Sequence, residues 1–256
     1  RRGLFIGSDV TSKYTRRSEL EYYNIASYIH AIIRERTGNY LVFCPSHAFL
    51  EQVYTAYADH FQDENRVECI LQEDFMREEE REAFLQRFRE GRNAAPIQTG
   101  QAPTSVLQDN APVSLEELIQ FPVEYEEEKS LVGFCVMGGI FSEGIDLKND
   151  SLIGAIIVGT GLPQVCNERE SLKKHFDARG ENGFDYAYRY PGMNKVLQAA
   201  GRVIRTEEDL GIVALLDERF LQGAYQKMFP REWEHFEVVT TSQIGKRVER
   251  FWNEWL

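Results

Sequence analysis

Residues 39–60 read NYLVFCPSHAFLEQVYTAYADH and join two patterns of different period. Asn39–Cys44 is a short apolar run with β-propensity, which Pro45-Ser46 interrupts. From His47 to His60 the apolar side chains return at helical spacing. A strand that is apolar on both faces and leads into a helix is typical of a parallel sheet covered by helices. We therefore expect an α/β fold.

The same alternation of apolar runs and helical patterns continues on both sides of this unit. Further strands are expected at Val67–Leu71, Leu131–Met137, Leu152–Gly159 and Ile212–Leu216. Further helices are expected at Ser18–Arg36, Arg77–Glu90, Asn167–Arg179 and Met193–Arg205, with a closing helix from about Ser242. Trp252 and Trp255 should pack this last helix onto the domain or onto a second one. The pattern predicts one domain over 1–256, with a mainly parallel sheet between two layers of helices.

The composition excludes several classes of protein. Of the 256 residues 43% are hydrophobic, which is enough to bury a core and excludes a disordered chain. The apolar runs are too short to cross a bilayer and no signal peptide is readable, so we expect a cytoplasmic protein without a membrane partner. The four cysteines are widely spaced, which favours reduced thiols and offers no metal site. Because the chain begins at Arg1 without Met, we expect a fragment of a longer protein.

The net charge of −12 is unevenly distributed. Residues 61–131 hold 17 acidic and 7 basic side chains, a net of −10, whereas residues 167–205 hold 5 acidic and 8 basic ones, a net of +3. Within the acidic part, residues 92–130 have no long apolar period and contain the run Glu124–Glu128. We expect an acidic insertion or long loop there, with at most a short helix at Ser114–Gln120.

The most informative segment is QAAGRVIR, residues 198–205. On a helix turning about 100° per residue, four polar side chains would share an arc of roughly 80°, with apolar ones opposite. These are Lys195, Gln198, Arg202 and Arg205. Gly201 would cost about 1 kcal/mol in a helix, which hints at close backbone packing. Permanently charged guanidiniums on a rigid face suit phosphoryl groups, although a solvated basic face has the same spacing.

Two loops that follow predicted strands also carry polar side chains. FSEGIDL, residues 141–147, comes after an apolar strand and a pair of glycines. Ligands of open α/β sheets usually bind at this end of a strand, although an ordinary loop would look the same. The loop offers Ser142, Glu143, Gly144 and Asp146. In the second loop Ser46 lies at a helix start, where it suits either a phosphate contact or a helix cap.

In this order the three segments resemble motifs IV, V and VI of superfamily 2 DNA helicases, and most closely the second RecA-like domain of the XPD/DinG family. The resemblance runs from Phe43 to about Arg231. It includes GLP at 161–163 and is strongest over RYPGMNKVLQAAGRVIRTEED at 189–209. It implies a RecA-like fold and, in the full-length protein, ATP-dependent 5′→3′ unwinding of DNA. ATP and Mg²⁺ would be bound mainly by an N-terminal RecA-like domain of the same chain, and single-stranded DNA would be the partner.

The resemblance also implies roles for individual residues. Arg205 would be the arginine finger, Arg202 a second phosphate contact, and Gln198 would help to place them. The nucleotide-binding residues would be Asp146, Gly144 and Gly201. The strand-binding residues would be Ser46, Ser142 and Glu143. Tyr186, Tyr188 and Tyr190 suit base stacking as well as packing, and packing is the more common use of such residues.

Some expected features of a self-sufficient ATPase are missing from the sequence. It holds no G-x-x-x-x-G-K-[ST] phosphate-binding loop. Asp217-Glu218 imitates a Walker B strand end, but it follows the arginine motif and is interpreted as structural. We therefore expect this chain alone not to hydrolyse ATP. The iron–sulfur cysteines of the family belong to its first half, so no cluster is expected here.

Two other classes remain as alternatives. A non-catalytic RecA-like scaffold module in DNA repair would not need both arginines of the Gln198–Arg205 strip. A Rossmann-type enzyme would carry a glycine-rich fingerprint after its first strand, which is absent. Under the helicase interpretation the acidic segment faces away from the sites, so deletion of residues 93–129 should preserve strand binding.

Overall fold

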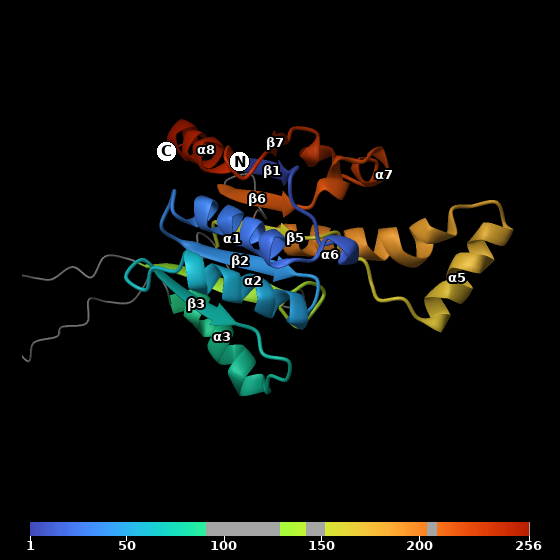
Figure 1. Cartoon of the computed structure of the whole chain (residues 1–256), viewed down its shortest axis with the longest axis horizontal. Coiled ribbons are helices and arrows are strands. Elements are labelled where there is room, and N and C mark those ends of the chain that lie inside the picture. Colours follow the sequence, from blue (N-terminus) through green and yellow to red (C-terminus); the bar gives the residue numbers. More distant parts are fainter. Residues whose placement is uncertain (91–128, 142–151, 204–208, 256) are drawn as a thin grey trace, which may run out of the picture.

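The computed structural model describes residues 1–90, 129–141, 152–203 and 209–255. Within these ranges seven strands form one sheet of order β3-β4-β2-β5-β6-β1-β7, and every neighbouring pair is parallel (Figure 1). The strands are β1 Arg2–Gly7, β2 Asn39–Cys44, β3 Val67–Leu71, β4 Ser130–Val136, β5 Gly154–Val158, β6 Gly211–Leu216 and β7 Glu237–Val239. The predicted α/β class and parallel sheet are confirmed.

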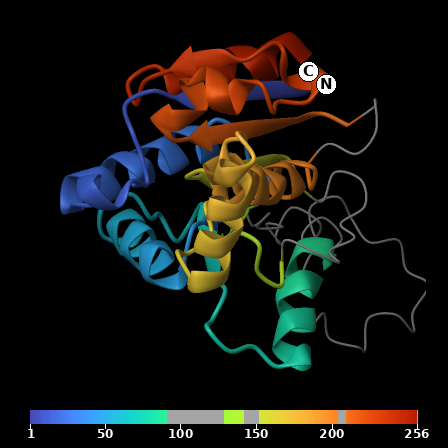
Figure 2. The same ribbon diagram turned by 90° about the vertical axis from the view of Figure 1, so that its right-hand side faces the viewer.

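Helices cover both faces of the sheet, as Figure 2 shows for α1 and α2 on one side and α3 on the other. The first face carries α1 Glu19–Ile33, α2 His47–His60 and α8 Ile244–Trp255. The second face carries α3 Glu78–Glu90, α6 Tyr190–Ala200 and the short elements η5 Glu218–Leu221, α7 Gly223–Gln226 and η6 Arg231–Trp233. No described helix is long and apolar enough to span a bilayer.

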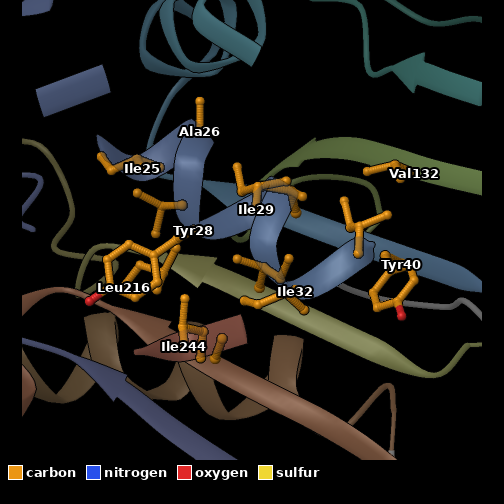
Figure 3. Close-up of a cluster of buried hydrophobic side chains, with 14 of the residues drawn as sticks. Ile25, Ala26, Tyr28, Ile29, Ile32, Tyr40, Val132, Leu216 and Ile244 are labelled. Carbon is orange, nitrogen blue, oxygen red and sulfur yellow. The ribbon is translucent and has the colours of Figure 1, made fainter. Parts of the chain in front are cut away.

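Strand β2 shows why the sheet could be predicted. Its side chains alternate between two cores, so Tyr40 and Val42 pack under α1 and α2, while Leu41 and Phe43 pack against α3 and α6. All six residues of the strand are buried. Figure 3 shows part of the first core, in which side chains of α1 meet Tyr40. Burial on both faces removes polar alternation and leaves an uninterrupted apolar run.

Two strands, β1 and β7, were not predicted, and they take the last two positions of the sheet order. β1 pairs with β6 from Arg2↔Gly211 to Gly7↔Leu216, and on its other side with β7. Its apolar stretch is only Leu4–Ile6 between two glycines, which is too short to stand out. β7 has three residues and forms an edge of the sheet, so its pattern is equally weak.

The helix expected over Met193–Arg205 is wrong at both ends. α6 begins at Tyr190, directly after a π-helical turn, η4 Asp185–Arg189, and ends at Ala200. Gly201 is the C-cap, and the amides of the next two residues bond three residues back, at 3.3 Å, in a tighter turn. Arg202 therefore leaves the helical stripe that the spacing predicted. Arg205 lies outside the described residues, as do 91–128 of the predicted insertion.

Helix α5, Asn167–Ala178, stands away from the sheet at the end of an arm that η4 completes (Figure 1). None of the α5 side chains is buried. The arm is held by ring contacts instead, with Tyr186 stacked on Phe176 at 3.8 Å, and by a hydrogen bond from Tyr188 Oη to Glu170, 2.6 Å. Packing is thus the observed role of Tyr186 and Tyr188. Tyr190 is 41% exposed and contacts the Tyr186 ring edge-on, with 5.3 Å between the ring centres.

Candidate functional site

The carboxyl ends of all strands meet at one edge of the sheet, because the strands are parallel. Ser46 follows β2 there, Gly138 follows β4, and Gly159–Gly161 follow β5. The predicted loop 141–147 begins at the same edge, at the end of the described part that closes with Phe141. The other predicted residues of that loop lie outside the described residues, and so does Arg205. The loop residues concerned are Ser142, Glu143, Gly144 and Asp146.

Ser46 is the N-cap of α2. Its hydroxyl accepts a hydrogen bond from the Phe49 amide at 3.3 Å, so the capping interpretation of this serine is correct. His47, the first residue of the helix, lies 3.1 Å from the carboxylate of the exposed Asp74 in the loop after β3. The Ser46 hydroxyl still carries a proton that it can donate. The assignment of Ser46 as a contact to single-stranded DNA stays a prediction.

The GLP turn fixes the start of α6. Gly161 has φ +66°, and a Cβ placed on it would lie 2.6 Å from the carbonyl oxygen of Gly192. A Cβ on Gly192 would in turn lie 2.7 Å from the carbonyl oxygen of Thr160. The end of β5 and the first turn of α6 therefore touch backbone to backbone, which only glycine allows. This contact sets the direction in which α6 carries its polar side chains.

Along α6, Gln198 is exposed on the last turn, and Arg202 follows two residues after the helix ends. The two side chains come from adjacent turns, although not from one helical stripe. Lys195, one turn before Gln198, extends its aliphatic stem over Gly138 at the end of β4. Burial lowers the pKa of Lys195, and the charge of Arg169 lowers it further.

Asp217, at the end of β6, is completely buried. Its carboxylate accepts hydrogen bonds from the Ser12 amide at 2.7 Å, from the hydroxyls of Thr11 and Ser12, and from Nε and Nη2 of Arg219 at 2.8 and 2.7 Å. Burial alone would raise the pKa of Asp217, but the hydrogen bonds and charge of Arg219 outweigh it and lower the pKa. A carboxylate engaged in this way fits the predicted structural strand end and leaves no position for a metal ion.

The loop between β1 and α1 belongs to the same edge, and no motif pointed to it. The Val10 carbonyl accepts the Glu218 amide at 2.9 Å, and Lys13 Nζ lies 2.6 Å from Glu218 Oε1, so the loop is tied to the end of β6. Tyr14 is 83% exposed, with the Arg17 guanidinium 5.2 Å from its ring centre. The cations beside an aromatic residue in TSKYTRR, residues 11–17, were the available sequence signal.

The chemistry of this edge suits an anion better than a cation. Its described side chains offer guanidinium, ammonium, amide and hydroxyl donors. No group of three His, Cys, Asp or Glu residues that could hold a metal ion occurs in the described ranges. The four cysteines are all free thiols. Guanidinium, ammonium, amide and hydroxyl donors of this kind bind phosphate oxygens.

Known proteins resemble this chain in both sequence and structure. The family described as Helicase C-terminal domain matches residues 29–236. The chain is 26% identical over 225 residues to the ATP-dependent DNA helicase XPD of Sulfolobus acidocaldarius, covering 84% of this chain and 31% of that protein. It is 37% identical over 91 residues to the ATP-dependent DNA helicase DinG of Photobacterium profundum, covering 35% and 13%.

Solved structures agree on the fold. Apo XPD superposes with a TM-score of 0.61 at 21% identity, over 93% of this chain and 40% of that one. The RNA-bound Dbp5 of S. cerevisiae, as its L327V variant with ADP BeF3, superposes with a TM-score of 0.51 at 13% identity, over 98% and 45%. The chain spans less than a third of the curated relatives named above. The chain belongs to the helicase C-terminal domain family and has the RecA-like fold of helicases of the XPD/DinG type.

Proposed function

We propose that the chain is the C-terminal motor domain of an ATP-dependent 5′→3′ DNA helicase. It would supply an arginine finger and contacts to single-stranded DNA, while an N-terminal RecA-like domain of the same protein completes the ATP site. The observation that carries this proposal is the position of α6. Backbone contact with the GLP turn holds the first turn of the helix at the carboxyl edge of the sheet. From there the helix runs along the sheet to Gln198, exposed on its last turn, and to Arg202 beyond its end, where Val203 lies against Gly211 at the start of β6.

Within this proposal the residues divide the work by chemistry. Arg205 and Arg202 would donate hydrogen bonds to phosphate oxygens of ATP, where their fixed charge stabilises the charge that develops on transfer. Gln198 would orient these two side chains. Hydrolysis of ATP supplies the free energy for closing and opening the two domains over the strand. On this chain the assigned nucleotide residues are Asp146, Gly144 and Gly201, and the assigned strand residues are Ser46, Ser142 and Glu143.

The proposal is tested with Arg205→Ala in the protein that carries both RecA-like domains. Loss of an arginine finger lowers turnover by about 10³-fold or more, so strand-stimulated ATP hydrolysis should nearly vanish. The matched control is Arg247→Ala on α8, a partly exposed arginine whose partner is Glu237 at 3.4 Å. This variant should keep its turnover. Urea unfolding of both variants checks that the fold is retained. Near wild-type turnover of Arg205→Ala would reject the arginine-finger role.

Two further measurements test the two-domain ATP site and the polarity of unwinding. The chain without a first RecA-like domain should show no magnesium-dependent ATP hydrolysis, and measurable turnover by the pure chain would contradict the two-domain site. The complete protein should unwind a duplex with a 5′ single-stranded overhang and leave one with a 3′ overhang intact. The opposite preference would overturn the proposed polarity. A protein that binds the strand but has no ATPase activity would favour the scaffold alternative.

A further inference from the structure

Lys195 is a half-buried cation to which none of the motifs assigns a role. Its direction is set by Gly138, which has φ +72° at the end of β4. A Cβ placed on Gly138 would lie 2.7 Å from both Cδ and Cε of Lys195. The glycine thus leaves the space through which the lysine stem passes, and the ammonium group is delivered to the carboxyl edge of the sheet.

A second cation lies beside it. Nη1 of Arg169, on α5, donates to the carbonyl oxygen of Ala187 at 2.9 Å, which ties the guanidinium to the base of the arm. Its charge is close enough to lower the pKa of Lys195, in addition to the larger effect of burial. Two like charges therefore share a partly desolvated position, which is unfavourable without a counter-charge.

Three other cations at or near this edge have acidic partners. Lys13 lies 2.6 Å from Glu218, Arg219 pairs with Asp217 at 2.7 Å, and Arg189 pairs with Asp185. Across the ranges that the structure describes, no such ion pair is recorded for Lys195 or Arg169. Partly buried charges are normally paired, so an uncompensated pair at a ligand-binding edge points to an external anion.

We infer that Lys195 and Arg169 form a phosphate-binding pair at the carboxyl end of β4. The inference rests on the proposed function, which supplies two phosphate ligands, single-stranded DNA and ATP. Lys195 lies one turn before Gln198 on α6, and Gly138 precedes in sequence the loop to which DNA and nucleotide contacts are assigned. The shared chemistry is a phosphate group, from either the DNA backbone or ATP.

The test compares Lys195→Met with Lys195→Arg in the protein that carries both RecA-like domains. Methionine keeps an unbranched stem over Gly138 and removes the charge, whereas arginine keeps the charge. The matched control is Lys246→Met, an exposed lysine on α8 at the opposite face of the sheet. Two quantities are measured, the affinity for oligo(dT) over a range of salt concentrations and the KM for ATP at saturating strand.

If the pair binds a phosphate of the DNA backbone, Lys195→Met should lower the affinity for oligo(dT) about tenfold. The slope of log K against log salt should also flatten by about 0.7, the value of one phosphate contact on a single strand. If the pair binds a phosphate of ATP instead, the KM for ATP should rise about tenfold and the salt slope for oligo(dT) should not change. In either case Lys195→Arg should stay close to the wild-type affinity or KM, because it keeps the charge. If Lys195→Met leaves both quantities at wild-type values, the inference is wrong.

Chemical footprinting separates failure of this inference from failure of the proposed function. Acetylation of Lys195 by acetic anhydride is followed by mass spectrometry, with and without inorganic pyrophosphate, in the wild-type protein. Protection of Lys195 but not Lys246 is expected, because only the first faces the phosphate position. Absence of protection overturns the phosphate-binding pair itself. A protein that protects Lys195 and yet shows no strand-stimulated ATPase activity would contradict the helicase proposal alone.

Discussion

Replacement of Arg219 by methionine should destabilise the fold strongly, because it leaves the buried Asp217 carboxylate without its cation. Asp217 is fully buried and the Arg219 side chain is 14% exposed, so water cannot replace the guanidinium. The substitution removes the Nε and Nη2 contacts to Asp217, at 2.8 and 2.7 Å, and the contact of Nη2 with the Ser12 hydroxyl at 2.7 Å. Loss of one partner of a buried ion pair costs about 3–5 kcal/mol.

The remaining contacts place the expected effect at the lower end of that range. Asp217 keeps the amides of Ser12 at 2.7 Å and of residue 219 at 3.0 Å, and it keeps the hydroxyls of Thr11 and Ser12. These donors continue to stabilise the ionised carboxylate. We therefore expect Arg219→Met to lower the free energy of unfolding by about 3 kcal/mol at pH 7. Urea unfolding followed by tryptophan fluorescence measures this difference.

The pH dependence provides a second check on the same pair. Arg219 holds the pKa of Asp217 below its ordinary value, so its contribution to stability is present above the unfolded pKa of about 3.9 and is lost as the pH falls through the folded pKa. In Arg219→Met the pKa of the buried carboxyl rises, and protonation relieves the uncompensated charge. The difference in stability between wild type and variant should therefore be full at pH 7 and smaller at pH 4.

A double-mutant cycle with Asp217→Asn isolates the pair. The double variant should lose less stability than the two single variants added together, because neither partner is then left charged and alone. Arg250→Met is the control, since its ion pair with Glu237 at 2.7 Å is largely exposed and should contribute about 0–1 kcal/mol. A loss in Arg219→Met no larger than in this control, or a loss independent of pH, would refute the assigned role of Arg219.

Two further variants test the packing of the fold by urea unfolding. Gly180→Ala should lower the free energy of unfolding by about 1–2 kcal/mol, because of the positive φ alone. Gly161→Ala should lower it by more, because its new Cβ would also meet a carbonyl oxygen 2.6 Å away. Equal losses in the two variants would mean that the contact with Gly192 is not tight. Tyr57→Phe should leave stability unchanged or raise it by up to about 1 kcal/mol, since the buried Tyr57 hydroxyl has no hydrogen-bond partner among the described residues. A clear loss of stability in that variant would show that the hydroxyl has a partner in solution.

The parallel sheet and its helix layers were largely predictable because local pattern and tertiary burial agree there. The uninterrupted apolar runs of β2 and β5 reflect burial on both faces, and the charged helix α3 shows its inner side through Phe84 and Phe88. The strand β1 escaped prediction because its position in the sheet depends on pairing with β6, more than 200 residues away. Pairing at such a distance has no local signature.

The end of α6 illustrates a second limit of pattern reasoning. A period of 3.6 residues continues through residues 198–205, so the arginines appeared to extend the helix. Gly201 instead caps the helix and starts a tighter turn, which takes Arg202 off the stripe. Glycine is the residue that most favours a helix end, and its cost in a helix interior was already the warning. The roles assigned to Gln198, Arg202 and Arg205 stay predictions, and only the single helical stripe is corrected.

The sequence by itself determined the fold class, the motor motifs and their order, because these depend on residue types at short spacing. Only the tertiary structure decided which residues meet across the chain. It placed the Asp217 carboxylate against Arg219 and the loop that precedes α1, and it directed Lys195 over Gly138 towards Arg169. The physical reason is that desolvation and charge pairing act through space. Whether a buried charge is paired inside the protein or awaits a ligand depends on neighbours that are distant in sequence.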